Sequence, residues 1–244
     1  ASGSTGVTTT VVGLMMTWPR PVVVVEADPS GGSQILAGYF RGLARPGLSG
    51  LVLAHRQQQL SAELEPRLFE VADSRARFLP GTRSPLQAST VVGIWDALLG
   101  ALRQMESAEG VDVIVDAGRL GLVGSPEPLI AESDVTLLVA GSGLPELAAV
   151  RSWQPWLGRG SSAIRIALVD PGHPYEPGEV ERDLGVPVLG TIPWVTEAAR
   201  AWSHGEKVRS GRRSAALVRA VSTLGESLLA CAEISPAAAV RGLR

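Results

Sequence analysis

Short apolar runs recur along the chain, and we interpret them as β-strands. Several are continuous in Val, Leu or Ile, without polar residues at alternate positions. Continuous runs of this kind are typical of parallel strands that are buried on both faces. The predicted strands are Pro21–Glu26, Gly50–Leu53, Arg75–Leu79, Val111–Asp116, Asp134–Ala140, Ile164–Val169 and Val186–Leu189.

The segments between these runs have helical periodicity. The stretch from Leu86 to Met105 carries apolar residues three or four positions apart, and so does the stretch from Ser214 to Glu233. Strands that alternate with helices predict an α/β fold, with a doubly wound, mostly parallel sheet flanked by helices. We expect one domain over residues 1–244, because no long linker or internal repeat interrupts the pattern.

The composition supports a folded protein and excludes several classes. Hydrophobic residues make up 45% and charged residues 19% of the 244 residues, and the mean hydropathy is +0.19, which excludes a disordered chain. No apolar run reaches the roughly 18 residues of a membrane span, so we expect no transmembrane segment and a cytoplasmic location. The one cysteine, Cys231, excludes an internal disulfide framework and a Cys-based zinc site. The histidines His55, His173 and His204 have no metal-ligand spacing.

The first ten residues form a glycine-rich segment that leads into an apolar stretch. A glycine-rich turn before a helix presents backbone N–H groups that bind phosphate. A complete phosphate loop also has Lys followed by Ser or Thr, and here Thr8 is present but Val7 occupies the lysine position. The candidate nucleotide-binding residues are Gly3, Ser4, Thr5, Gly6, Val7, Thr8 and Thr9.

Aspartates lie at or just beyond the ends of two predicted strands. Asp28 follows a buried strand in the turn Glu26-Ala27-Asp28-Pro29, and Asp116 ends the strand Val111–Asp116, as in a Walker B Mg²⁺ site. Each has a plainer interpretation, since Asp28 would also fix an Asx turn and Asp116 would be an ordinary strand-end carboxylate. Because the glycine-rich segment is also present, we favour the interpretation that both aspartates belong to an ancestral nucleotide site.

The whole series of motifs, including the run Leu-Gly-x-Pro-x-Leu-Gly-x-Ile-Pro from Leu184, resembles the ParA/MinD family of deviant-Walker P-loop ATPases. The resemblance extends over essentially the entire chain and includes the CpaE/TadZ-like branch. It implies an ATP site in which Thr8 and Asp116 bind Mg²⁺ and Asp28 positions the attacking water. Asp170 stands where the family often has an Asn near the base.

The resemblance also exposes three departures from the family. Ser2 stands in place of the signature lysine and Val7 in place of the phosphate-binding lysine, and Lys207 is the only lysine of the chain. We therefore expect ATP and Mg²⁺ binding to be weak or lost, and hydrolysis to be weak or absent. The family also has a strand before the loop, and we expect that strand, with sequence upstream of Ala1, to be missing from this chain.

The leading functional prediction is a ParA/MinD-like positioning or scaffold protein in chromosome partitioning, division-site placement or pilus localisation. An active ATPase switch stimulated by DNA, lipid or a partner is the first alternative, and an ATP-dependent ligase of the dethiobiotin synthetase type is the second. The resemblance implies a homodimer with a protein partner. The segment from Arg200 to Arg219 is basic, which makes it a candidate surface for DNA or an anionic membrane, with a peripheral location at the inner membrane or nucleoid.

Overall fold

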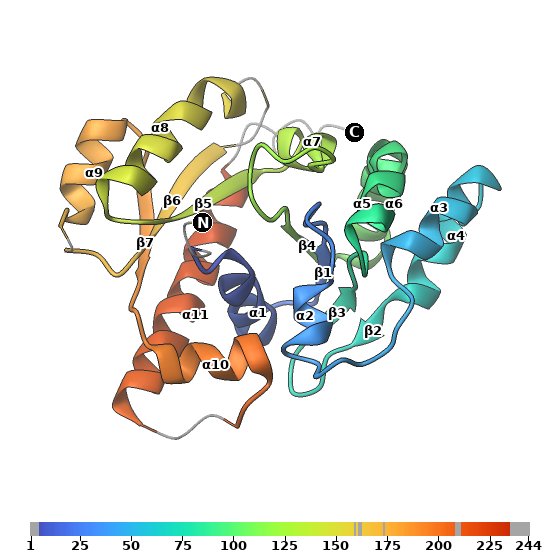
Figure 1. The fold of residues 1–244 in the computed structure, drawn as a ribbon, viewed down its shortest axis with the longest axis horizontal. Helices are drawn as coiled ribbons and strands as arrows, with labels where there is room; N and C mark the ends of the chain where they lie inside the picture. The colour runs from blue at the N-terminus through green and yellow to red at the C-terminus, as the bar shows by residue number, and fades with distance from the viewer. Residues whose placement is uncertain (1–4, 159, 161–162, 173, 208–210, 235–244) are drawn as a thin grey trace. The chain divides into compact units, whose positions relative to one another are not determined.

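The computed structural model describes residues 5–158, 160, 163–172, 174–207 and 211–234, and the chain folds into two compact units. The first, here called the β1 unit, consists of Thr8–Leu129 and Arg200–Lys207. The second, the β6 unit, consists of Ala1–Val7, Ile130–Ala199 and Val208–Arg244. Each unit is a sheet with helices, which agrees with the predicted α/β class (Figure 1). The assignment of residues 1–244 to one domain remains a prediction.

The β1 unit is built on a four-stranded sheet with strand order β2-β3-β1-β4. Its strands are β1 (Val22–Glu26), β2 (Phe69–Glu70), β3 (Ala76–Leu79) and β4 (Asp112–Asp116). β1 runs parallel to both β3 and β4, whereas the short β2 is antiparallel to β3. The register of β1 and β4 places Glu26 opposite Asp116, so two carboxyl groups leave the same edge of the sheet.

Helices pack against this sheet through apolar stripes. One cluster joins alternate residues of β1, Val23 and Val25, to residues of α3, α4 and α6, among which Leu51, Leu64 and Leu98 are fully buried. Figure 1 shows α5 and α6 on one side of β1 and β4, with α1 on the other. The helical elements are α1 (Val7–Thr17), α2 (Gln34–Ala37), α3 (Leu48–Arg56), α4 (Leu60–Leu64), η1 (Glu65–Arg67), α5 (Pro85–Val91), η2 (Val92–Ile94) and α6 (Trp95–Glu109).

The strand predicted at Gly50–Leu53 is wrong, because this segment lies inside helix α3. Leu48, Leu51 and Ala54 are buried, while Leu53 is 61% exposed. Burial at every third residue is the period of a helix face, and a short apolar run does not distinguish a helix from a strand. The helix predicted from Leu86 to Met105 is confirmed in outline, with the 3₁₀ turn η2 separating α5 from α6.

The β6 unit contains a parallel three-stranded sheet with order β5-β6-β7. Helices α8 and α9 cover one side and α11 the other (Figure 1). Helix α11 starts two residues earlier than predicted, and Cys231 is buried on its stripe. The elements are β5 (Val135–Gly141), α8 (Leu144–Leu157), β6 (Ala163–Val169), α9 (Pro177–Leu184), β7 (Val188–Ile192) and α11 (Arg212–Glu233). The helices α7 (Glu127–Ala131) and α10 (Thr196–His204) are divided between the units, with Glu127–Leu129 and Arg200–His204 in the β1 unit.

The strand predicted at Val186–Leu189 is shifted, since β7 begins at Val188 and extends to Ile192. Pro187 has no N–H to donate, and its carbonyl accepts a hydrogen bond from the Ile166 amide just before the regular pairing starts. The fold class is otherwise confirmed. The expected absence of a strand before the loop concerns residues 1–4, which lie outside the described residues.

Two helical stretches in the described part of the chain have the length and hydropathy of a membrane span, namely Pro85–Glu109 and Arg212–Glu233. Both carry a stripe of buried residues, such as Leu98 in the first and Leu224 in the second. A buried stripe of this kind is the pattern of a helix in the core of a folded domain.

Candidate functional site

The glycine-rich segment leads directly into α1. Gly6 has φ +84°, a conformation that glycine adopts without steric cost, and the helix begins at the next residue, Val7. Thr8 and Thr9 occupy the first turn, where backbone N–H groups have no partner within the helix. Gly3 and Ser4 lie outside the described residues. Thr5, Gly6 and Val7 group with the β6 unit, and the helix from Thr8 onward groups with the β1 unit.

Asp116 is the most deeply buried carboxylate of the candidate site, with no exposed surface. Its Oδ1 accepts a hydrogen bond of 2.9 Å from the Gly118 amide, whereas its Oδ2 has no partner among the described residues. Burial raises the pKa of Asp116 to about 6, opposed by hydrogen bonding from the Gly118 amide and the Thr8 hydroxyl. The negative charges of Glu26 and Asp28 add to the increase in this pKa.

Asp28 is half-buried in the turn that follows β1. Its Oδ1 accepts a hydrogen bond of 2.8 Å from the Ser30 amide, so the interpretation of this residue as the anchor of an Asx turn is confirmed. The same carboxylate lies against Gly118, where an added Cβ would come within 2.3 Å of Asp28 Cγ. Asp28 and the loop after Asp116 are therefore in direct contact.

Glu26 is a residue of this region that the sequence analysis did not select as functional. It is 3% exposed, and its carboxylate accepts hydrogen bonds from the Ile35 amide at 3.0 Å, the Gly81 amide at 2.9 Å and the Ser33 hydroxyl. Burial raises the pKa of Glu26, and these three donors oppose the increase. The sequence signal that could have identified Glu26 is its position directly after four valines. A buried carboxylate at such a position needs several hydrogen-bond donors.

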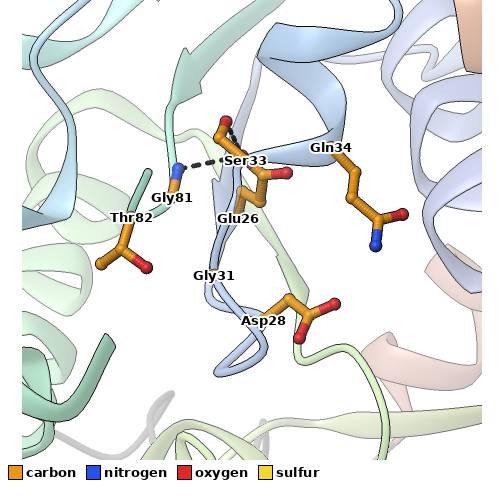
Figure 2. A pocket seen from close by; sticks show the side chains of 7 residues that line it. All are labelled: Glu26, Asp28, Gly31, Ser33, Gln34, Gly81 and Thr82. Atoms are coloured by element: carbon orange, nitrogen blue, oxygen red, sulfur yellow. Dashed lines mark hydrogen bonds between the residues drawn. The ribbon is translucent and has the colours of Figure 1, made fainter. Parts of the chain in front are cut away.

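Glu26 and Asp28 line a shallow hollow in the β1 unit. Figure 2 shows Glu26 directed toward Ser33 and Gly81, and the Asp28 carboxylate directed away from them. Thr82 also lines this hollow, and its Oγ1 is buried without a hydrogen-bond partner in the described part of the chain. The Gly32 and Ser33 amides donate to the Thr82 carbonyl, which ties the Asp28 turn to the loop after β3.

Thr8, Asp28 and Asp116 are therefore brought together within the β1 unit. The described residues contain no group of three or more His, Cys, Asp or Glu side chains that would hold a metal alone. Mg²⁺ does not require such a cage, because it usually keeps several waters and binds one or two protein oxygens together with substrate phosphates. The unpartnered Oδ2 of Asp116 and the nearby Thr8 hydroxyl fit a Mg²⁺ site of this type.

The predicted basic segment is divided between the two units. Arg200 belongs to the β1 unit and pairs with Glu206 at 2.6 Å, so this pair adds little net charge. Arg212, Arg213 and Arg219 are exposed on α11 of the β6 unit, and Arg209 lies outside the described residues. Asp170, the candidate base-recognition position, follows β6 with φ +54°.

Comparison with solved structures identifies the fold. The chain resembles the cell division ATPase MinD of Pyrococcus furiosus, with a TM-score of 0.73 and 16% sequence identity. The similarity covers 94% of this chain and 95% of the MinD chain. Pyrococcus horikoshii MinD, solved with Mg-ADP, gives a TM-score of 0.71 at 16% identity over 93% and 92% of the two chains. A ParA family ATPase from Chlorobium tepidum gives 0.65 at 16% identity over 93% of each chain.

No protein-family model matches the sequence, and no curated protein matches it either. The structural similarity covers nearly the whole chain at low identity. The ParA/MinD-like fold that the sequence motifs imply is therefore confirmed, while residue roles have to be argued from the site itself.

Proposed function

We propose that this chain is a ParA/MinD-like positioning or scaffold protein with a degenerate ATP site. It binds Mg²⁺-ATP weakly and hydrolyses it slowly or not at all. The observation that carries the proposal is the buried Oδ2 of Asp116, which has no hydrogen-bond partner in the described part of the chain and lies near the Thr8 hydroxyl, while Val7 occupies the lysine position. The oxygen ligands suited to Mg²⁺ are retained, and the phosphate-binding cation of the loop is lost.

The retained residues have definite roles in this proposal. The amides of the first turn of α1, from Thr8 onward, bind phosphate oxygens, because they have no partner within the helix and point toward an anion. Thr8 and Asp116 hold Mg²⁺, which neutralises phosphate charge when it is bound. Asp28 lies against Gly118 in the loop after Asp116 and orients water through Oδ2, since its Asx turn with Ser30 uses Oδ1.

The substitution at Val7 sets the expected strength of binding. A charge-assisted hydrogen bond to phosphate contributes about 1.5–3 kcal/mol, so its loss weakens binding roughly 10- to 150-fold. Loss of one preorganised stabiliser of a transition state typically lowers a rate by about 10²- to 10³-fold. Binding thus survives the substitution better than hydrolysis does.

Calorimetric titration with Mg²⁺-ATP, together with phosphate release, tests the proposal. We expect measurable binding and phosphate release far below that of a working switch. Thr8→Val removes the hydroxyl near Asp116 and should abolish the Mg²⁺-dependent part of binding. The matched Thr90→Val, at an exposed position of α5 in the same unit, should bind like the wild type. Rapid ATP turnover that Asp28→Ala abolishes would contradict the degenerate site and favour the active switch.

A partner surface on α11 belongs to the same proposal. Arg212, Arg213 and Arg219 are exposed near the start of this helix, and neighbouring cations attract DNA phosphates or anionic lipid. The protein would act as a homodimer at the membrane or nucleoid surface. Arg212→Glu with Arg213→Glu should weaken binding to duplex DNA or to phosphatidylserine vesicles, while Arg56→Glu with Arg182→Glu provides the charge-matched control. Equal binding by the two double variants would exclude α11 as the surface.

A further inference from the structure

The candidate site has an excess of negative charge. Glu26, Asp28 and Asp116 act on one another electrostatically, and residues 1–10 contain no lysine or arginine. A nucleoside triphosphate brings further negative charge to the start of α1. Mg²⁺ compensates part of this repulsion, and phosphate sites generally add a fixed cation from the protein.

The loops that follow the parallel strands of the β1 unit are the places from which such a cation would reach the site. Arg41 and Arg45 lie in the segment between α2 and α3, and Arg83 and Arg119 lie in the described loops after β3 and β4. Arg41 is directed to the Gly205 carbonyl, and Arg45 lies over the Phe69 ring, 5.6 Å from its centroid. Arg83 is directed to the Arg45 carbonyl at 3.0 Å. The first three arginines are thus directed to groups other than the three carboxylates.

Arg119 differs from the others in its position. It directly follows Gly118, whose amide donates to Asp116 and whose backbone lies against the Asp28 carboxylate. Gly118 has φ +65°, so the backbone turns sharply immediately before Arg119. Arg119 makes interactions of its own and is exposed, so what distinguishes it is this place next to the two aspartates.

We propose that Arg119 provides the phosphate-binding cation that the loop lacks at Val7, by binding the terminal phosphate of a nucleoside triphosphate held on α1. Arginine suits this role because its planar guanidinium donates two parallel hydrogen bonds to phosphate oxygens. The inference rests on the proposed function, since it needs a nucleotide at the same site. The inference goes beyond the proposed function because it assigns the missing cation of the phosphate loop to Arg119, in the loop after β4. No sequence motif marks that loop as a source of the cation.

Calorimetric titration of Mg²⁺-ATP and Mg²⁺-ADP into four proteins tests the inference: wild type, Arg119→Ala, Arg119→Lys and Arg56→Ala. Arg56 is an exposed arginine of the same unit on α3, so its variant makes the same change in net charge. We expect Arg119→Ala to bind Mg²⁺-ATP about 10- to 100-fold more weakly, with a smaller loss for Mg²⁺-ADP. Arg119→Lys should restore part of the affinity, and Arg56→Ala should bind like the wild type.

Two negative results have different meanings. If Arg119→Ala and Arg56→Ala bind Mg²⁺-ATP equally well, the role of Arg119 is overturned and nucleotide binding stands. If the wild type does not bind at millimolar Mg²⁺-ATP, the proposed nucleotide site is overturned together with this inference. Equal thermal unfolding midpoints of the two alanine variants show that a loss of binding does not come from a loss of fold.

Discussion

The carboxylate of Asp28 lies against the backbone of Gly118, two residues after Asp116 in the loop that follows the neighbouring strand. A Cβ at Gly118 would come within 2.3 Å of Asp28 Cγ and 2.6 Å of its Oδ1. Since real Cβ atoms do not approach other atoms so closely, only glycine allows this contact. The contact joins the turn after β1 to the loop after β4, and so brings the two aspartates of the candidate site together.

Gly118→Ala should therefore destabilise the protein and displace Asp28. The positive φ costs about 1–2 kcal/mol for a residue with a Cβ, and overpacking against Asp28 adds roughly 1–3 kcal/mol. Gly110→Ala is the matched control, because Gly110 has φ +66° and open space around its Cβ position. Urea unfolding should show a clearly larger loss of stability for Gly118→Ala. Equal losses would mean that Asp28 moves aside at no cost.

The raised pKa of Asp116 predicts a particular dependence of stability on pH. The folded protein holds this proton up to about pH 6, whereas the unfolded chain loses it near 3.8, so the folded state binds more protons in that interval. Asp116 therefore contributes fully to the free energy of unfolding below pH 3.8, and this contribution is lost as the pH rises through 6. The loss amounts to up to about 3 kcal/mol.

Asp116→Asn should remove this dependence. The variant should be more stable than the wild type at pH 7, and the difference should shrink toward pH 4. Asp73→Asn, at an exposed turn position, controls for a general loss of charge. Urea unfolding at several pH values measures the effect, and a difference that stays constant from pH 4 to pH 7 would contradict the assignment to Asp116.

Val7→Lys should restore the cation at the start of α1. Val7 is half-buried at the first residue of the helix, and a lysine there would add a charge-assisted hydrogen bond to phosphate. We expect Mg²⁺-ATP to bind about 10- to 100-fold more tightly than in the wild type. Val7→Met, which lengthens the side chain without charge, should leave the affinity unchanged. A lysine variant that binds no better would show that loss of affinity lies elsewhere in the loop.

Gly13 on α1 packs against Trp202 near the end of α10, and an added Cβ would come within 2.6 Å of the indole ring. Gly→Ala inside a helix normally stabilises by up to about 1 kcal/mol. At Gly13 we expect instead a net loss of about 1–2 kcal/mol, because overpacking costs more than the propensity gain. Gly100→Ala in α6 meets no atom within 4 Å and should stabilise. Thermal unfolding of the two variants should give shifts of opposite sign.

Much of the fold could be predicted from the sequence because its strands are apolar runs with a clear period. The strand of four valines, Val22–Val25, is fully buried as expected, and the strand that ends at Asp116 lies next to it. The strand prediction for Gly50–Leu53 is wrong because a run of four residues is too short to distinguish the period of a strand from that of a helix. Only its packing, with Leu51 in the core and Leu53 outside, shows a helix.

The sequence by itself determined the α/β class, most of the strands, and the residue types of the candidate site, including Val7 at a lysine position. Local spacing carries this information, since strand ends, glycine-rich turns and helix starts depend on neighbouring residues. Only the tertiary structure decided that Asp28 contacts Gly118 and that Glu26 is held by Ile35, Ser33 and Gly81. It also decided that one oxygen of Asp116 has no hydrogen-bond partner among the residues that the structure describes. Those relationships join segments far apart in the chain, and they depend on strand order and burial, which no local pattern specifies.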